Sequence, residues 1–153
     1  MTEPIIMQYD TLLVSGFPGI GKSYYCNKTN LKVLDSDSSK FSKSCFPGNY
    51  IKHIKDNLGK VDIIFISTHK QVRDALVKNN LEFTLVYPDI SLKEEYKQRY
   101  KKRGSNNSFL MTLDLFWDEW IKQLENQKNC NKIVLQSNEY LSHVINKLEN
   151  YKY

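Results

Sequence analysis

A glycine-rich stretch near the N-terminus constrains this chain more than any other feature of its sequence. Residues 16–23 read Gly-Phe-Pro-Gly-Ile-Gly-Lys-Ser, which fits the pattern G-x-x-x-x-G-K-[ST]. Glycines in this pattern let the backbone wrap closely around phosphate oxygens, with the amide hydrogens pointing inward. The lysine and the hydroxyl residue stand where they can reach terminal phosphates and Mg²⁺. The stretch therefore predicts a cradle for a nucleoside triphosphate.

The individual positions of this cradle have expected roles. We expect Lys22 to bind the β- and γ-phosphates and Ser23 to ligate Mg²⁺. With glycine at about 7% of residues, a chance match in a chain of 153 residues is roughly a one-in-a-few-hundred event. The pattern is therefore specific enough to make ATP and Mg²⁺ the expected ligands. The residues expected to contact the nucleotide are Gly16, Pro18, Gly19, Ile20, Gly21, Lys22, Ser23 and Tyr24.

Short apolar strands alternate with helices along the rest of the chain. Such alternation indicates an α/β fold in which a five-stranded parallel sheet carries helices on both faces. The length of 153 residues fits one domain, residues 1–153. Strands are predicted at 11–15, 32–34, 61–66, 83–87 and 132–135. Helices are predicted near 22–27, 50–58, 71–78, 91–103 and 109–126, and from 138 onwards.

A pair of aspartates follows the second predicted strand. Asp35 and Asp37 would reach the carboxyl edge of the sheet, where parallel sheets bind their ligands. Either carboxylate could orient or deprotonate an attacking hydroxyl or hold Mg²⁺, and Asp37 joins Ser23 as an expected metal ligand. The alternative role is an Asx turn or a helix cap. The third strand ends in Ser67-Thr68 without an acid, so the aspartate pair is the expected substitute.

A basic segment precedes a glycine-containing loop in the second half of the chain. Arg99 and Arg103 are spaced i, i+4, so on a helix they share one face and could both bind a triphosphate. The loop after Arg103 would let residues 91–108 close as a lid. The alternative is an exposed helix whose glutamates pair with its own basic residues. In the next helix, an aromatic stripe that includes Phe116 and Trp117 is expected in the core.

The overall charge and the cysteine content leave some classes of protein open and argue against others. A net charge of +5 and a pI near 9.0 suit nucleic-acid binding, phosphate binding or a solvated helix face. No apolar run approaches the length of a membrane span, so no membrane association is expected. Residues 1–10 carry no basic cluster, unlike a signal or transit peptide. Three distant cysteines indicate free thiols in a reducing cytosol, hence a cytoplasmic protein.

With these features in order, the chain resembles the P-loop nucleoside and nucleotide kinases. It looks closest to the compact kinase-like proteins common in bacterial viruses and their hosts. The resemblance rests on Gly16–Ser23, on Asp35-Ser36-Asp37, and on Arg99 and Arg103-Gly104 in a lid-like position. It implies a three-layer P-loop NTPase fold with strand order 2-3-1-4-5, ATP and Mg²⁺ as ligands, and a separate pocket for the phosphoryl acceptor.

The same resemblance locates the two ends of the expected site. Residues 38–58 would form the acceptor-binding segment. Within it, Phe41, Phe46 and Tyr50 either stack on a base or simply pack together. Residues 136–138 would lie near the adenine of ATP.

The resemblance implies an ATP- and Mg-dependent phosphotransferase, a kinase that acts on a nucleotide or nucleoside acceptor. Two alternatives stay open. The positive charge favours a polynucleotide or modified-DNA (hydroxymethyl base) kinase, whereas the missing acid after the third strand fits a nucleotide-binding switch with weak ATPase activity. Thr68 and His69 could also touch a substrate. The expected catalytic residues are Lys22, Asp35, Asp37, Arg99 and Arg103.

Overall fold

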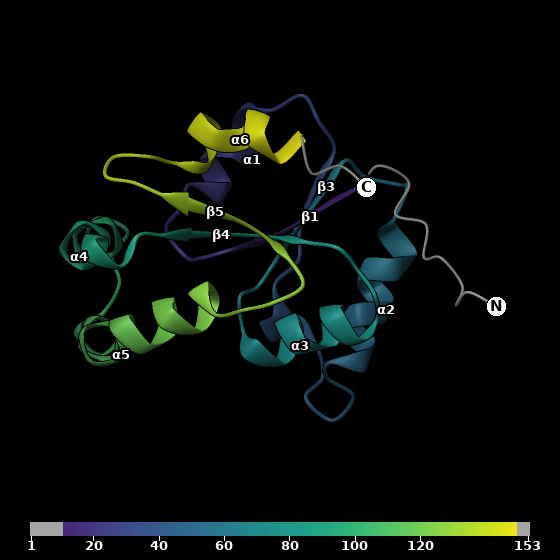
Figure 1. Ribbon diagram of the computed structural model, residues 1–153, viewed down its shortest axis with the longest axis horizontal. Helices are drawn as coiled ribbons and strands as arrows, with labels where there is room; N and C mark the ends of the chain where they lie inside the picture. Colours follow the sequence, from purple (N-terminus) through teal and green to yellow (C-terminus); the bar gives the residue numbers. More distant parts are fainter. Residues whose placement is uncertain (1–10, 150–153) are drawn as a thin grey trace.

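The computed structural model describes residues 11–149, without the side chains of residues 146, 148 and 149, and is built on a parallel sheet (Figure 1). The order of its strands is β2-β3-β1-β4-β5, and all neighbours pair in parallel. The expected α/β class, five strands and strand order are confirmed. Expectations for residues 1–10 and for the ends of the domain lie outside the described residues. The strands are β1 (Leu12–Gly16), β2 (Val33–Asp35), β3 (Ile63–Ile66), β4 (Thr84–Pro88) and β5 (Asn131–Leu135).

Helices cover both faces of this sheet (Figure 1). One face carries α1 (Lys22–Lys28) and α6 (Leu141–Glu149), and the other carries α2 (Gly48–Asn57), α3 (Lys70–Lys78) and α5 (Asn107–Glu125). The remaining helix, α4 (Lys93–Lys102), lies beyond the carboxyl ends of β4 and β5 and beside α5. Short 3-10 turns occupy Ser38–Lys40 and Ile90–Leu92. Among the helices of residues 11–149, none combines the length and the apolar character that crossing a membrane requires.

Burial follows the position of each element in the layers. β1, β3 and β4 are buried along their whole lengths, as expected for strands covered on both faces, whereas the edge strand β5 is partly exposed. Trp117 of α5 is fully buried, and its Nε1–H donates to the carbonyl of Ile90 at 2.7 Å. Phe116, predicted in the same stripe, is instead 43% exposed. Adjacent helix residues point about 100° apart, so only one of the two rings can face the sheet.

Two helices begin later than predicted, because hydrogen bonds at their expected starts favour other conformations. Before α4, the carboxylate of Asp89 accepts hydrogen bonds from the N–H of Ser91 at 3.0 Å and from its hydroxyl at 2.6 Å. This forms a separate 3-10 turn ahead of the helix. Asn138, predicted to start the last helix, has a φ of 62° and donates its N–H to Glu95 at 3.0 Å. The residues before α6 therefore form a loop that faces α4.

Replacing Trp117 by Ala should lower the free energy of unfolding by about 3–5 kcal/mol, because a fully buried ring is lost and a cavity remains. Denaturant titration followed by circular dichroism measures this loss. Phe116→Ala is the matched control, and its half-exposed ring should contribute less than about 1 kcal/mol. Equal losses in the two variants would contradict the placement of Trp117 as the core residue.

Candidate active site

The loop between β1 and α1 holds the glycine-rich motif at the carboxyl edge of the sheet. Its first residue, Phe17, donates its N–H to a β4 carbonyl at 2.9 Å. Gly19 and Gly21 have φ angles of 89° and 93°, a region that side chains disfavour. A Cβ on Gly19 would lie 3.0 Å from the ring of Tyr100, and one on Gly21 would lie 3.1 Å from the ring of Tyr140. Both positions therefore require glycine for conformation and for space.

The backbone N–H groups of residues 19–24 donate no hydrogen bond to any residue that the structure describes. The helical ladder begins only with Tyr25, whose N–H donates to the carbonyl of Gly21 at 3.1 Å. Successive unpartnered N–H groups in a curved loop form a concave site for anionic oxygens. The loop can thus bind several phosphate oxygens without breaking a hydrogen bond of its own.

The motif borders a cleft of about 720 Å³, which we call the loop cleft. It lies between the loop, α4 and the residues before α6. Burial lowers the pKa of Lys22, and the positive charge of Arg103 adds to this effect, whereas Asp35 opposes it. An anion in the cleft would stabilise the charged form of this lysine. The cleft is lined by Pro18, Gly19, Gly21, Lys22, Ser23, Tyr24, Glu95, Gln98, Arg99, Lys102, Arg103, Asn138 and Tyr140.

Two of the residues expected to contact a nucleotide do not line this cleft. Gly16 is the last residue of β1, and the side chain of Ile20 is fully buried. A Cβ on Gly16 would lie only 2.8 Å from Cδ1 of Ile20, so the glycine makes room for that side chain. Ile20 can still offer its backbone N–H to a ligand. The role of Gly16 in this structure is packing beneath the loop.

The two aspartates after β2 differ in what their carboxylates do. Oδ1 of Asp37 accepts hydrogen bonds from the N–H of Ser39 at 2.9 Å and from its hydroxyl at 2.7 Å, and so caps the following turn. These bonds lower the pKa of Asp37. Asp35 is exposed, has no hydrogen bond or ion pair with another described residue, and acts electrostatically on Lys22. The capping alternative therefore describes Asp37, while Asp35 has a free carboxylate near the cleft lysine.

A metal ion would need ligands from outside the protein. Within residues 11–149 no group of three or more His, Cys, Asp or Glu side chains could hold one. Mg²⁺ at phosphate sites typically takes one or two protein ligands, with phosphate and water oxygens completing its shell. The hydroxyl of Ser23 and the carboxylate of Asp35 fit this requirement, since neither bonds to another described residue. Asp37 would have to share its carboxylate with Ser39.

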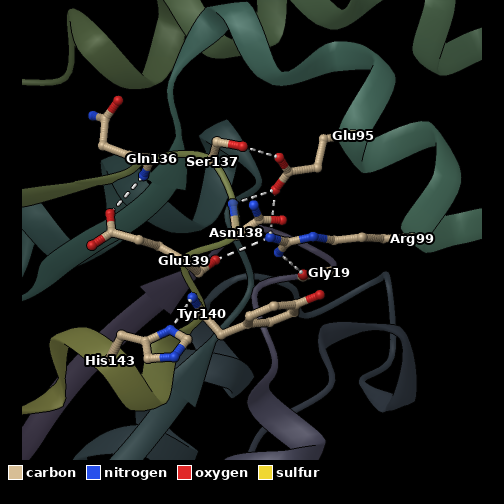
Figure 2. Close-up of polar contacts among 9 residues, drawn as sticks. All are labelled: Gly19, Glu95, Arg99, Gln136, Ser137, Asn138, Glu139, Tyr140 and His143. Carbon is tan, nitrogen blue, oxygen red and sulfur yellow. Dashed lines mark hydrogen bonds and ion pairs between the residues drawn. The ribbon is translucent and has the colours of Figure 1, made fainter.

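Both terminal nitrogens of Arg99 in α4 donate hydrogen bonds, to three different residues (Figure 2). Its Nη1 donates to the carbonyl of Gly19 at 2.8 Å, and its Nη2 donates to the carbonyl of Glu139 at 3.0 Å. Its guanidinium also lies over the rings of Tyr96, at 4.2 Å, and Tyr140, at 3.9 Å. The side chain is only 9% exposed. In this arrangement Arg99 connects the loop to the residues before α6, and its contact with a phosphate stays a prediction.

The carboxylate of Glu95 completes this network (Figure 2). Its Oε2 accepts from Arg99 Nη2 at 2.8 Å and from the N–H of Asn138 at 3.0 Å. Its Oε1 accepts from the hydroxyl of Ser137 at 2.7 Å. Burial raises the pKa of Glu95, but these hydrogen bonds outweigh burial and the pKa is lowered. From the sequence, Glu95 was expected only to pair with basic residues of an exposed helix. In the structure this pairing is the ion pair with Arg99, whose side chain is buried.

Arg103 lies at the end of α4 and makes fewer contacts within the protein than Arg99 does. It is exposed, lines the loop cleft and has no ion pair with any carboxylate of the described chain. Its guanidinium lies 5.7 Å from the ring centre of Tyr100. It is also close enough to Lys22 to lower the pKa of that lysine. The structure thus gathers three cations without ion pairs in the described residues, Lys22, Lys102 and Arg103, around a cleft rich in free N–H groups.

In the expected acceptor segment, 38–58, the three rings pack on one another. Tyr50 is fully buried, and its hydroxyl donates to the carbonyl of Ser36 at 2.7 Å. Its ring lies 4.9 Å from that of Phe41 and 5.7 Å from that of Phe46. Of the two alternatives for these rings, packing is the one that the structure favours.

A second cavity, of about 340 Å³, lies on the other side of the loop. We call it the α3–α5 cavity, because the start of α3 and one face of α5 form most of its wall. No motif indicated it, since its residues come from four separate segments. It is lined by Phe17, Pro18, Thr68, His69, Lys70, Arg73, Tyr100, Phe109, Leu113, Trp120, Gln123 and Leu124.

Comparison of the chain with protein-family models and with curated proteins finds no match. The family resemblance consequently rests on the motif residues alone. Besides Glu95, the residues near the loop that the sequence did not single out include Tyr100, Tyr140 and Arg73, because none of them belongs to a local pattern.

The network around Glu95 predicts a pH-dependent contribution to stability. Because the folded pKa of Glu95 lies below its usual value of 4.5, the contribution should be complete above that pH and disappear as the pH falls through the folded pKa. We expect Glu95→Gln to cost about 1–2 kcal/mol of unfolding free energy at pH 7 and clearly less at about pH 3. Denaturant titration at both pH values measures the difference.

Glu94 provides the matched control, since its side chain is 75% exposed. Glu94→Gln should change the unfolding free energy very little at either pH. If Glu95→Gln cost the same at both pH values, the hydrogen-bonded carboxylate would not be the source of the effect.

Proposed function

We propose that this protein is an ATP- and Mg²⁺-dependent phosphotransferase of the P-loop NTPase fold, acting on a nucleotide or nucleoside acceptor. The observation that carries the proposal is the loop at residues 16–23. Its N–H groups at 19–24 are unpartnered, Lys22 stands beside them, and the loop follows the central strand of a parallel sheet. This is a complete phosphate-binding arrangement in which each feature supports the others.

In the proposed complex, the triphosphate of ATP lies along the loop. The free N–H groups bind its bridging and terminal oxygens, and Lys22 and Arg103 balance its negative charge from two sides. Ser23 would hold Mg²⁺, which would neutralise charge on the β- and γ-phosphates when bound, while the carboxylate of Asp35 stays available to the acceptor. The nucleoside end of ATP would extend toward Asn138 and Tyr140, at the far side of the loop cleft.

Asp35 is the proposed base for the chemical step. A hydroxyl oxygen of the acceptor bonds to the γ-phosphorus, the bond from that phosphorus to the β–γ bridging oxygen breaks, and ADP leaves. Asp35 orients the hydroxyl and takes its proton, because its carboxylate has no other hydrogen bond within the described residues. Positioning and electrostatics supply most of the rate acceleration in such reactions.

The basic charge favours a polynucleotide or modified-DNA acceptor less than the sequence suggested. Lys97 and Lys93 of α4 both pair with Asp114, at 3.2 Å and 3.5 Å, so part of the basic segment is neutralised within the protein. Lys101 and Lys102 stay exposed. A nucleotide-gated switch with slow ATP hydrolysis is the second candidate, since β3 is followed by Ser67-Thr68 and brings no acid to the site.

A transfer assay separates these candidates. Purified protein, labelled ATP and Mg²⁺ are incubated with panels of nucleosides, nucleoside monophosphates and 5′-hydroxyl oligonucleotides. We expect one small-molecule class to be phosphorylated, and Lys22→Ala to lower turnover by about 10²-fold or more while the circular dichroism spectrum is kept. ATP hydrolysis without any phosphorylated acceptor would favour the switch, and wild-type turnover in Lys22→Ala would overturn the proposal.

The two aspartates should respond differently to substitution. Asp35→Asn should lower kcat by about 10²–10⁴-fold with little change in KM for ATP, because the proton acceptor is lost. Asp37→Ala should mainly cost about 1 kcal/mol of stability, because a capping carboxylate is lost. Steady-state kinetics and denaturant titration on both variants measure these effects. The reverse outcome, with kcat dependent on Asp37, would assign the base role to that residue instead.

A further inference from the structure

The α3–α5 cavity has the walls of a binding site for a flat ring. Phe17, Phe109 and Trp120 line it together with leucines and a proline, and its polar groups come from the β3–α3 connection, α3, α4 and α5. Small-molecule sites typically combine apolar and aromatic walls with a few fixed polar groups. A volume of about 340 Å³ suits one nucleoside-sized molecule and is too small for a strand of nucleic acid.

Arg73 is the unusual member of this lining. It is only 4% exposed, yet no carboxylate of the described residues lies within ion-pair distance of it. The neighbouring Asp74 pairs instead with Lys70 at 2.6 Å. Burial lowers the pKa of Arg73, and Asp74 only partly opposes this. Buried charges are almost always paired, so an unpaired one beside a cavity indicates a missing partner.

The hydrogen bonds of Arg73 show which of its groups is available. Its Nε donates to the carbonyl of Thr68 at 2.9 Å, and its Nη1 donates to Oε1 of Gln127. Both bonds fix the guanidinium in place. No described residue accepts a hydrogen bond from Nη2. The Nη2 group of Arg73, a residue that lines the cavity, is therefore left to donate to a ligand.

The residues that line the cavity indicate which chemical group would accept the hydrogen bond from Nη2 of Arg73. A phosphate dianion would be poorly compensated here, because Lys70 already pairs with Asp74, Arg73 already donates to two acceptors, and much of the remaining wall is apolar. A carbonyl oxygen needs only one or two donors and brings no charge with it. An aromatic ring with such an oxygen would satisfy both the aromatic walls and Nη2.

The α3–α5 cavity also lies next to the loop cleft. Pro18 lines both the α3–α5 cavity and the loop cleft, so the two spaces meet across a single residue of the phosphate-binding loop. A ring in the cavity would thus lie next to the loop that is proposed to hold the γ-phosphate. A hydroxyl attached to that ring through a sugar could reach across.

We propose that the α3–α5 cavity is the acceptor subsite, and that it takes a nucleoside whose base carries an oxo group, with Arg73 donating to that oxygen. The proposal rests on the phosphotransferase function above and identifies its acceptor class. It moves the acceptor from the segment 38–58, whose rings pack on one another, to a cavity formed by α3, α5 and the loop.

Tryptophan fluorescence tests the site without any need for turnover. Of the two tryptophans, Trp120 lines the cavity and Trp117 is fully buried in the core. The protein, with Mg²⁺ and a non-hydrolysable ATP analogue, is titrated with deoxyinosine and with deoxyadenosine, which differ in an oxo against an amino group. We expect both nucleosides to quench the fluorescence of Trp120, because their bases would lie close to its ring and stack on it. The Kd should be about 10–100-fold lower for deoxyinosine. This comparison requires no variant.

Variants then assign the preference to Arg73. Arg73→Gln should remove the advantage of deoxyinosine and leave the weaker binding of deoxyadenosine nearly unchanged. Lys122→Ala is the matched control, because Lys122 lines a different hollow that Arg73 also borders and is not among the residues that line the α3–α5 cavity. Trp120→Phe should abolish the quenching signal. If Arg73→Gln does not fold, the ratio of the Kd values for deoxyadenosine and deoxyinosine in the wild-type protein still tests the proposal.

Three results would overturn the proposal: no quenching by either nucleoside, equal Kd values for the two, or quenching by a 5′-hydroxyl oligonucleotide as strong as by deoxyinosine. These results are distinct from failure of the proposed function. Phosphorylation of some acceptor without nucleoside binding in the cavity would leave the phosphotransferase and remove the subsite. Selective deoxyinosine binding without any transfer would leave the subsite and remove the phosphotransferase.

Discussion

The shape of the loop cleft depends on one buried guanidinium. Arg99 joins the phosphate-binding loop, through Gly19, to the residues before α6, through Glu139, and it does so between two tyrosine rings. Its charge is compensated by Glu95, which is itself held by the backbone and hydroxyl groups that precede α6. Removal of Glu95 would leave the buried charge of Arg99 without its carboxylate partner. The loop, α4 and the residues before α6, which form the walls of the cleft, are therefore joined by one hydrogen-bond network.

Much of the fold could be predicted because its signals are local. The apolar run at 61–66 predicted a strand covered on both faces, and β3 is buried along its whole length. The glycine pattern at 16–23 required a loop that only glycines can form, and the positive φ angles of Gly19 and Gly21 meet that requirement. The strand order came from the resemblance and is confirmed, since spacing alone does not distinguish the orders that right-handed crossovers allow.

The finer roles of the site residues could not be predicted, because they depend on contacts between distant segments. Arg99 meets a carbonyl 80 residues earlier in the chain and another 40 residues later. No spacing rule indicates either contact. Arg73 is similar, because an arginine inside an amphipathic helix is usually solvated and only the tertiary structure shows it buried beside a cavity. For Asp37, by contrast, the Asx-turn alternative was visible in the sequence, since Ser39 stands two residues after it.

The hydroxyl of Tyr100 donates to the carbonyl of Pro18, and Arg99, the preceding residue of α4, holds the carbonyl of Gly19. Two adjacent side chains of α4 thus donate hydrogen bonds to two adjacent carbonyls of the loop. As a mechanical consequence, α4 and the loop form one rigid body, and α4 can swing away from bound phosphates only by releasing both carbonyls. The N–H groups of Arg103 and Gly104 donate to carbonyls of the last turn of α4, so this end of the helix belongs to the same rigid body. Arg103 therefore keeps a fixed position beside the loop cleft, and its cation is placed before any phosphate binds.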